Sequence, residues 1–378
     1  AGYADEVKAA RFGRDGNLYL LSRKGAPRGR VLRMPLGSPS LEAAAVVAEA
    51  SPDGSIESVE ATRAALYLVE LVGGPSRVRV LALDGTERKP LEVPPVSSVR
   101  GLTRLGEGEV AWLAESYLSP AAWYRLDEAS GAVARLPLSP PSPVDFSDVE
   151  VRREVAVSKD GTRIPMSIIL RKGTRLDGKN PTILYGYGGY GLSQTPAFAP
   201  VRKLWLEQGG VYAIANLRGG GEYGEDWHRQ GMLERKQNVF DDFAACARLL
   251  VSRHYTSHER LGLLGGSNGG LLMGAMITQH PETARAVAQA IGLGGGRRAD
   301  GERVDLLLSD VILPGRSGRD LHTDLAARRP GLPVLFVSGH SEEVISREGV
   351  LLPGIHFLQK PFTADVLLAK VREVLGAR

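Results

Sequence analysis

The sequence predicts an all-β first region followed by an α/β region, and three observations carry this prediction. Short apolar runs with β-branched and aromatic residues recur through residues 1–145. Strand-like and helix-like segments alternate after that. The proline-rich stretch LPLSPPSPVDF at 136–146 separates the two patterns. Consecutive prolines can continue neither a helix nor a central strand, so this stretch marks a domain boundary.

The first region contains an internal repeat. NLYLLS at 17–22, ALYLVE at 65–70 and EVAWLAE at 109–115 recur about every 45 residues, and a second apolar run follows each. Repeats of this length with several short strands are typical of four-stranded propeller blades. We therefore expect a β-propeller fragment of about three blades over 1–146, with an open edge because a closed ring needs more blades. An unrelated β-sandwich is the alternative.

Composition excludes several classes of function. The 378 residues are 43% hydrophobic and 24% charged, and the net charge of +4 comes from Lys and Arg spread among acids, so no nucleic-acid partner is expected. The single cysteine, Cys246, excludes an internal disulfide, and its sequence context predicts a buried helix residue. No apolar run reaches about 18 residues, so we expect no membrane partner and a cytoplasmic location.

Alternating strands and helices after residue 147 predict a parallel sheet covered by helices on both faces. This region is expected over 147–296, where GLGGGRRADG at 292–301 punctuates the chain. The expected strands cover 154–159, 164–170, 181–187, 211–217, 260–266 and 284–291, and the expected helices cover 238–254 and 269–281.

The segment LLGGSNGGLL at 263–272 has the pattern of a nucleophile on a tight strand-to-helix turn. Such a turn needs glycines because neighbouring side chains would collide with the strand and the helix. Ser267 would be the nucleophile. The backbone N–H of Asn268 would lie at the helix amino end, where an oxyanion forms. A simple helix cap is the alternative interpretation.

Three longer segments resemble the prolyl oligopeptidase family of serine peptidases. They are PTILYGYGGYG, NLRGGGEYGEDWHRQGMLERKQNVFDDFAA and YTSHERLGLLGGSNGGLL, and the resemblance extends over about 1–292. In that family a β-propeller caps an α/β-hydrolase domain and admits short peptides, which are cut after proline or related residues. The resemblance thus implies acyl transfer on short proline-containing peptides through Ser267, without a cofactor.

The same resemblance implies roles for further residues. Asn268 would be the backbone oxyanion donor, and Tyr187, the second tyrosine of YGYGG, the side-chain donor. Tyr190 stands where the family usually has a phenylalanine in the proline pocket. Packing in the core or in a loop is the alternative for both tyrosines. Arg218 and Glu222, in RGGGEYG, would help to shape the site or form a structural ion pair.

An activated serine also needs an imidazole base and a carboxylate, which follow it in the order Asp, His in α/β-hydrolases. The resemblance stops at about residue 292, and neither the acid loop nor the histidine loop of the family follows. The family's pocket tryptophan is also missing, since all four tryptophans precede Ser267. We therefore expect this chain to hydrolyse peptides very weakly or not at all.

The remaining residues resemble the carboxy-terminal part of a response-regulator receiver domain. VDLLLSDVILPGRSGRDL, PVLFVSGH and FLQKPFTADVLLAKVREVL carry this resemblance over about 302–376. It implies Asp310 as phosphoacceptor, Ser338 and Lys360 as groups that contact the phosphoryl group, Phe357 as the aromatic switch position, and a histidine kinase as partner. Mg²⁺ would be needed only if Asp310 is phosphorylated. The acidic pair that holds Mg²⁺ in receivers is missing, and an Asp capping the next helix is the alternative.

The chain therefore resembles a join between two incomplete domains, and natural fusion, engineered chimera and assembly error all fit. Because both parent sheets are parallel, we expect the receiver-like (flavodoxin-like) βα units of 297–378 to continue the hydrolase-like sheet. Asp310 and His340 would then follow Ser267 in the order of a catalytic triad. More remote histidines are His280, His322 and His356. A phosphorelay signalling module and an inert protein remain the alternative functions.

Overall fold

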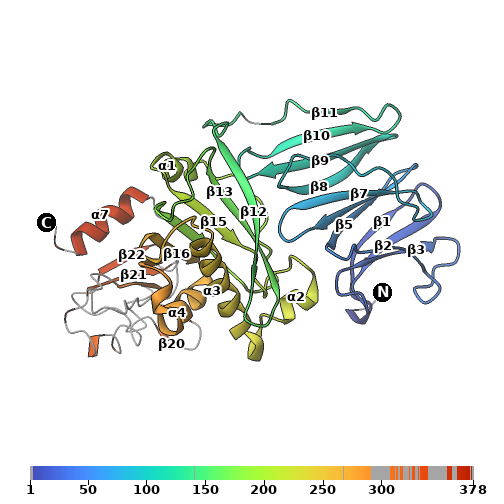
Figure 1. The fold of residues 1–378 in the computed structure, drawn as a ribbon. Coiled ribbons are helices and arrows are strands. Elements are labelled where there is room, and N and C mark those ends of the chain that lie inside the picture. Colours follow the sequence, from blue (N-terminus) through green and yellow to red (C-terminus); the bar gives the residue numbers. More distant parts are fainter. Residues whose placement is uncertain are drawn as a thin grey trace.

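The computed structural model describes residues 3–139, 141–266 and 268–290. Beyond these it describes 307–310, 312–313, 316–317, 323, 326–327, 331, 333–338, 356–359, 364–374 and 376. Figure 1 shows an all-β region that leads into an α/β region. Ser267, His322, His340 and Lys360 lie outside the described residues.

Three antiparallel sheets make up the all-β region, which also has a short 3₁₀ helix at Tyr3–Asp5. The first sheet contains β1 (Val7–Phe12), β2 (Asn17–Ser22), β3 (Arg30–Pro35) and β4 (Ala45–Glu49). The second contains β5 (Ser55–Ala61), β6 (Leu66–Leu71) and β7 (Ser76–Leu81). The third contains β8 (Ser97–Gly106), β9 (Glu109–Ser116), β10 (Ala122–Asp127) and β11 (Val133–Arg135). The three repeated apolar runs of the sequence fall on β2, β6 and β9.

Strand β6 lies in the middle sheet and is buried on both faces. Successive side chains of a strand point to opposite faces. Leu66 and Leu68 belong to the apolar cluster shared with the first sheet, whereas Tyr67 and Val69 belong to the cluster shared with the third. Full burial of one such side chain stabilises the fold by about 1.5–3 kcal/mol. The neighbouring sheets thus pack on the two faces of β6. Figure 1 shows the three sheets following one another through the all-β region.

A six-stranded sheet forms the α/β region. Its strands lie in the order β12 (Val149–Val157), β13 (Arg163–Arg171), β15 (Val211–Ala215), β14 (Thr182–Tyr185), β16 (Leu261–Gly266) and β17 (Ala286–Ala290). The first three strands pair antiparallel, and β15, β14, β16 and β17 pair parallel. The predicted parallel sheet is therefore present in β15, β14, β16 and β17, whereas β12 and β13 form an antiparallel hairpin at one edge that the prediction of a parallel sheet did not include.

The described part of the α/β region contains four α-helices: α1 (Arg202–Glu207), α2 (Glu225–Arg229), α3 (Gln237–Ser252) and α4 (Asn268–Gln279). Single 3₁₀ turns lie at Leu233–Arg235, His258–Arg260 and Pro281–Thr283. The apolar residues of α3 recur at helical spacing, and its inner face is buried against the sheet and α4. Cys246 is fully buried on α3, as predicted, and burial raises the pKa of its thiol.

Backbone and side-chain hydrogen bonds join the all-β region to the α/β region. Arg153 of β12 donates from Nη2 to the carbonyl oxygen of Gly73, in the turn between β6 and β7, at 2.6 Å. Ser98 Oγ donates to the Pro196 carbonyl at 2.8 Å, and the Glu225 N–H donates to the Pro27 carbonyl at 2.8 Å. These contacts come from all three sheets, so the α/β region is docked along the whole all-β region.

The described strands near the carboxy terminus form separate sheets. β18 (Leu307–Asp310), β21 (Val334–Ser338) and β22 (His356–Gln359) pair parallel in the order β18-β21-β22, and α7 (Ala364–Val374) follows. β19 (Ile312–Leu313) and β20 (Arg316–Ser317) form a short antiparallel pair. Within the described residues, β17 pairs with β16 and with no strand beyond it.

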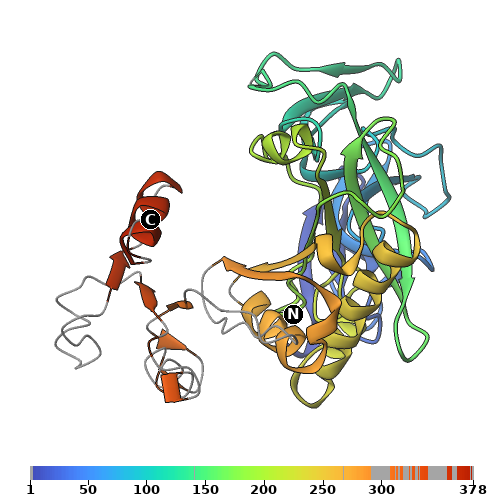
Figure 2. The ribbon, with the colours of Figure 1, turned by 60° about the vertical axis from the view of Figure 1, so that its left-hand side comes forward.

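The expectation that receiver-like strands continue the six-stranded sheet is therefore wrong for the described part of the chain. Figure 2 shows β18, β21, β22 and α7 to one side of the six-stranded sheet. Parallel strands satisfy their backbone hydrogen bonds equally well within a small sheet of their own, so the shared parallel character of the two halves does not enforce pairing between them. No helix in the described ranges is both long and apolar enough to cross a membrane.

Candidate active site

The carboxyl ends of β14 and β16 lie side by side and bring two loops together. The parallel register pairs Tyr185 with Leu264, and the N–H of Gly186 donates to the Leu264 carbonyl at 3.1 Å. The chain then leaves β14 through 186–191, while β16 ends at Gly266 and α4 begins at Asn268. In open α/β sheets this edge is where ligands bind.

Two glycines of the strand-to-helix segment are required by close packing. A Cβ atom on Gly265 would lie 2.4 Å from the Gly269 carbonyl oxygen, and one on Gly269 would lie 2.8 Å from the Gly186 carbonyl oxygen. Both distances are shorter than any real Cβ contact, and the atoms that would be met are backbone atoms. The strand, the helix and the loop after β14 therefore meet as closely as a tight turn requires. Ser267 itself lies outside the described residues.

Asn268 and Tyr187, both predicted site residues, are joined by a hydrogen bond. Asn268 Nδ2 donates to the Tyr187 carbonyl oxygen at 2.9 Å. Gly189 lies two residues after Tyr187, and a Cβ there would lie 2.2 Å from Asn268 Nδ2. Because Asn268 is the first residue of α4, its backbone N–H lies in the helical turn whose N–H groups have no intrahelical acceptor. Such groups attract negative charge.

Lys236 is a third residue at this edge, and sequence reasoning missed it. It lies just before α3, half-buried, and its Nζ donates to the Gly188 carbonyl oxygen at 2.6 Å. The same Nζ lies 3.5 Å from Asn268 Oδ1. Burial lowers the pKa of the Lys236 amine. The signal available in the sequence was a lysine directly before an amphipathic helix, in KQNVFDDF, which by itself indicates no contact.

Tyr190 does not lie in an enclosed pocket. Its side chain is 74% exposed, and its backbone has a φ of 55°, in the left-handed region that non-glycine residues rarely adopt. The loop thus presents this aromatic ring to solvent near the glycines of YGYGG. Its assignment to a substrate pocket stays a prediction.

The predicted ion pair of the RGGGEYG segment is confirmed for Arg218 and wrong for Glu222. Arg218 is buried and pairs with Asp242 of α3 at 2.6 Å, and also with Asp160. Glu222 is fully buried, and its Oε1 accepts a hydrogen bond from the Gln194 N–H at 2.7 Å. Burial raises the pKa of Glu222 to about 7. Glu222 is therefore a buried acid that anchors the end of the loop after β14.

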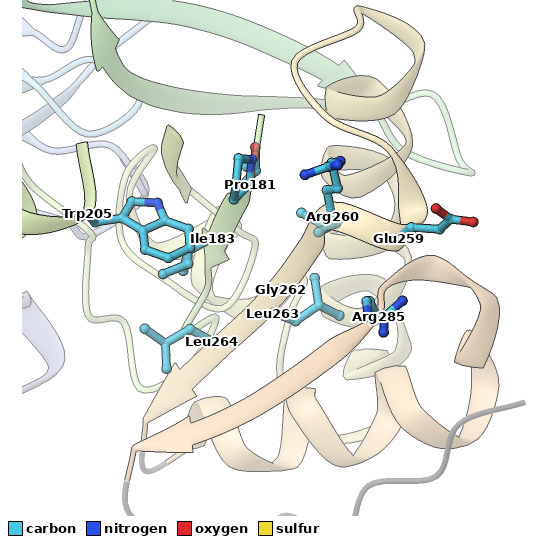
Figure 3. Close-up of a pocket in the computed structure, with 11 residues that line it drawn as sticks. Pro181, Ile183, Trp205, Glu259, Arg260, Gly262, Leu263, Leu264 and Arg285 are labelled. Carbon is cyan, nitrogen blue, oxygen red and sulfur yellow. The ribbon is translucent and has the colours of Figure 1, made fainter. Parts of the chain in front are cut away.

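The apolar pocket of the α/β region lies away from these groups. It has a volume of about 450 Å³ and opens beside the beginnings of β14 and β16, where Pro181 and Leu261 line it. Figure 3 shows the Trp205 indole next to Ile183, with Leu264 nearby. This pocket runs along β14 and β16 from their amino ends, and its lining includes none of Tyr187, Asn268 and Lys236, so we do not assign it to the predicted site.

The receiver-like residues lie in the small parallel sheet. Asp310 ends β18 and Ser338 ends β21, and the register pairs Asp310 with Val337, so both residues reach the same edge. Phe357 lies on β22 opposite Phe336. The predicted roles of these residues stay predictions, as does the pairing of Asp310 with His340, which lies outside the described residues.

Two remote histidines have acidic neighbours. His280 Nδ1 lies 3.8 Å from Glu282 Oε1, and His356 Nδ1 lies 3.5 Å from Glu373 Oε1. Among the described residues, no group of three His, Cys, Asp or Glu side chains is placed to hold a metal ion.

Comparison with known protein families agrees with this geometry. Residues 6–136 match the N-terminal β-propeller domain of prolyl oligopeptidase, and residues 196–294 match the prolyl oligopeptidase family model. Residues 276–372 also match the response regulator receiver domain, and this match overlaps the prolyl oligopeptidase match between residues 276 and 294.

Individual relatives include prolyl endopeptidases and prolyl oligopeptidases. A prolyl endopeptidase of Elizabethkingia meningoseptica is 35% identical over 284 residues, which cover 74% of this chain and 39% of the relative. A structure from an analysis of two prolyl endopeptidases aligns with a TM-score of 0.71 and 28% identity, over 98% of this chain and 60% of that one. Prolyl oligopeptidase B from Galerina marginata, bound to a 25mer macrocyclization substrate, aligns with a TM-score of 0.67 and 26% identity, over 75% and 40%.

This chain therefore covers about two-fifths of the length of the Elizabethkingia meningoseptica prolyl endopeptidase. The propeller and the α/β-hydrolase region of prolyl oligopeptidases are represented here by the three stacked sheets and the six-stranded sheet.

Proposed function

We propose that the edge formed by β14, β16 and α4 is a serine-type acyl-transfer site for short proline-containing peptides. The observation that carries this proposal is the hydrogen bond between Asn268 and Tyr187, because it holds the loop after β14 against the first turn of α4. The relatives in the prolyl oligopeptidase family support the reaction class and the substrate class.

The residues would act as follows. Ser267 Oγ forms a bond to the peptide carbonyl carbon, and the Asn268 N–H with the Tyr187 hydroxyl stabilises the negative oxygen that results. The C–N bond then breaks, the amine leaves with a proton, and water releases the acyl group from Ser267. This chemistry needs no cofactor.

Efficient reaction also needs a base for the Ser267 proton, and Asp310 with His340 is the pair whose chain order fits. The separate pairing of β18 weakens this assignment, since catalytic groups must be held to within about 0.5 Å. We therefore expect the chain to turn over proline-containing peptides very weakly or not at all, even if Ser267 reacts with strong electrophiles.

The test is labelling by a fluorophosphonate, measured by intact mass, on the parent chain and on Ser267→Ala and His340→Ala variants. Labelling that is lost in Ser267→Ala supports the site, and loss in His340→Ala as well assigns the base. An unlabelled parent chain that is folded by circular dichroism refutes the acyl-transfer proposal.

A second candidate function rests on the receiver-domain match and on the parallel order β18-β21-β22, which brings Asp310 and Ser338 to one edge. In this reading Asp310 accepts a phosphoryl group from a histidine kinase or a small phosphodonor. Incubation with acetyl phosphate and Mg²⁺ would add the mass of one phosphoryl group to the parent chain and none to Asp310→Asn. No mass gain in the parent would end this alternative.

A further inference from the structure

Lys236 joins two segments that carry the proposed oxyanion donors. Its Nζ donates to the carbonyl oxygen of Gly188 at 2.6 Å and lies 3.5 Å from Asn268 Oδ1. Asn268 in turn donates from Nδ2 to the carbonyl oxygen of Tyr187 at 2.9 Å. The carbonyl groups of Tyr187 and Gly188, the Asn268 side chain and the Lys236 ammonium group are therefore linked in a closed ring by these hydrogen bonds and the backbone.

This ring fixes two successive carbonyl groups at once. Tyr187 and Gly188 are neighbours in the chain, so holding both of their carbonyl oxygens defines the orientation of the backbone from which the Tyr187 side chain projects. The space beside the ring is full, because a Cβ on Gly188 would lie 2.3 Å from Val239 Cγ1, and one on Gly189 would meet Asn268. The loop therefore has little freedom while the ring is intact.

The charge of Lys236 is directed at carbonyl and amide oxygens rather than at an acid. Among the described residues it forms no ion pair with a carboxylate. Holding a half-buried cation without a counter-ion costs free energy, and this cost is consistent with the lowered pKa of its amine. A lysine that merely stabilised the fold would gain more from an acidic partner.

We propose that Lys236 is a positioning residue of the oxyanion site, which holds the Gly188 carbonyl group and the Asn268 side chain in the arrangement that acyl transfer needs. This inference rests on the proposed function. Lys236 does not touch the reacting atoms in this assignment. It acts through Asn268 and through the backbone that carries Tyr187.

The test compares Lys236→Met, which keeps the apolar stem and removes the donor, with Lys236→Arg, which keeps a cationic donor. Lys179→Met is the matched control because Lys179 is exposed. Two measurements are made on the full chain of each variant. One is the rate of fluorophosphonate labelling at Ser267, and the other is hydrogen–deuterium exchange of peptides that cover 185–192 and 268–274.

We expect Lys236→Met to slow labelling about tenfold, which is smaller than the loss of a direct oxyanion donor, about 10²–10³. Exchange should rise in 185–192, while peptides from β5 to β9 keep their protection. Lys236→Arg should recover most of both effects, and Lys179→Met should change neither. Recovery by Arg separates positioning through a donor from a general loss of packing.

The two measurements distinguish failure of the inference from failure of the proposed function. If the parent chain is never labelled, the acyl-transfer proposal fails. In that case faster exchange at 185–192 in Lys236→Met alone still supports Lys236 as the group that holds this loop. Unchanged exchange at 185–192 in Lys236→Met overturns the inference, and so does an exchange increase spread over the whole α/β region.

Discussion

Glu222 and Asn216 meet in a fully buried position behind the loop that follows β14. Asn216 Nδ2 donates to Glu222 Oε1 at 3.3 Å and to the Gln194 carbonyl oxygen at 2.7 Å, while the Gln194 N–H donates to the same Glu222 oxygen at 2.7 Å. The second carboxylate oxygen, Oε2, has no hydrogen-bond partner among the described residues. The loop between Tyr187 and Gln194 is thus anchored at its far end by a buried acid.

This acid makes stability depend on pH. Burial raises the pKa of Glu222 from 4.5 to about 7, so the folded chain keeps a proton that the unfolded chain loses above pH 4.5. The protonated Glu222 carboxyl therefore contributes its full stabilisation to the folded chain below pH 4.5. This contribution falls as the pH rises from 4.5 to about 7 and is lost above that pH. Its size is on the order of 3 kcal/mol. We expect Glu222→Gln to remove this slope, measured as the midpoint of thermal unfolding between pH 4.5 and 8.

The control for this prediction is Glu234→Gln, an exposed glutamate before α3. Its variant should follow the parent chain at every pH. A parent chain whose unfolding midpoint has the same pH dependence as Glu222→Gln would contradict the buried-acid assignment.

The buried pair of Arg218 and Asp242 should dominate the local stability of α3. Asp242 is fully buried and Asp160 is 46% exposed, yet both pair with the same guanidinium. Without the Asp242 charge the buried guanidinium keeps only the exposed Asp160 as an ion-pair partner among the described residues. Breaking a buried pair typically costs about 3–5 kcal/mol, whereas an exposed partner contributes up to about 1 kcal/mol. Chemical denaturation of Asp242→Asn and Asp160→Asn should show this difference. Equal losses in the two variants would mean that Arg218 reaches water.

Local patterns in the sequence predicted the elements around the site correctly. The alternation of apolar runs predicted β14, β15, β16 and β17, and the spacing of apolar residues predicted α3 to within two residues of its ends. The glycines of LLGGSNGGLL predicted the tight turn, because the requirement for no Cβ at Gly265 and Gly269 acts between near neighbours in the chain.

Contacts between distant segments were beyond prediction from one sequence. Lys236 and Gly188 are 48 residues apart, and Gln194 and Glu222 are 28 apart. No local preference indicates such a pairing. The same limit explains why the continuation of the six-stranded sheet was predicted incorrectly. The local sequence of β18 favours a strand but does not indicate which other strand it pairs with. Glu222 was predicted to shape the site or to form an ion pair, and the segment RGGGEYG carries no signal of its buried contact with Gln194.

Gly265 provides a direct test of the turn geometry. A Cβ there would lie 2.4 Å from a backbone oxygen of α4, so Gly265→Ala must displace the strand or the helix. We expect a loss of several kcal/mol in the free energy of unfolding, as for other overpacked backbone contacts. Gly274→Ala in α4 is the control. Among the described residues, no atom outside its own stretch of helix lies within 4 Å of its added Cβ, so this variant should be neutral or more stable by up to about 1 kcal/mol. Similar values for the two variants would contradict this packing.

Arg153 should couple the unfolding of the two regions. It donates to Gly73 in the all-β region and to Ser167 and Asn216 in the α/β region, and it is partly buried. Arg153→Met leaves these acceptors without a donor, at about 1–3 kcal/mol for each buried group. The link between the two regions is then weaker. Calorimetry should therefore resolve two unfolding transitions, or, where the parent chain already shows two, a larger difference between their midpoint temperatures. Arg152→Met, which removes a partly exposed pair with Glu150 on the same strand, should leave the calorimetric profile unchanged. An unaltered profile in Arg153→Met would mean that the contacts at Ser98 and Glu225 suffice to hold the regions together.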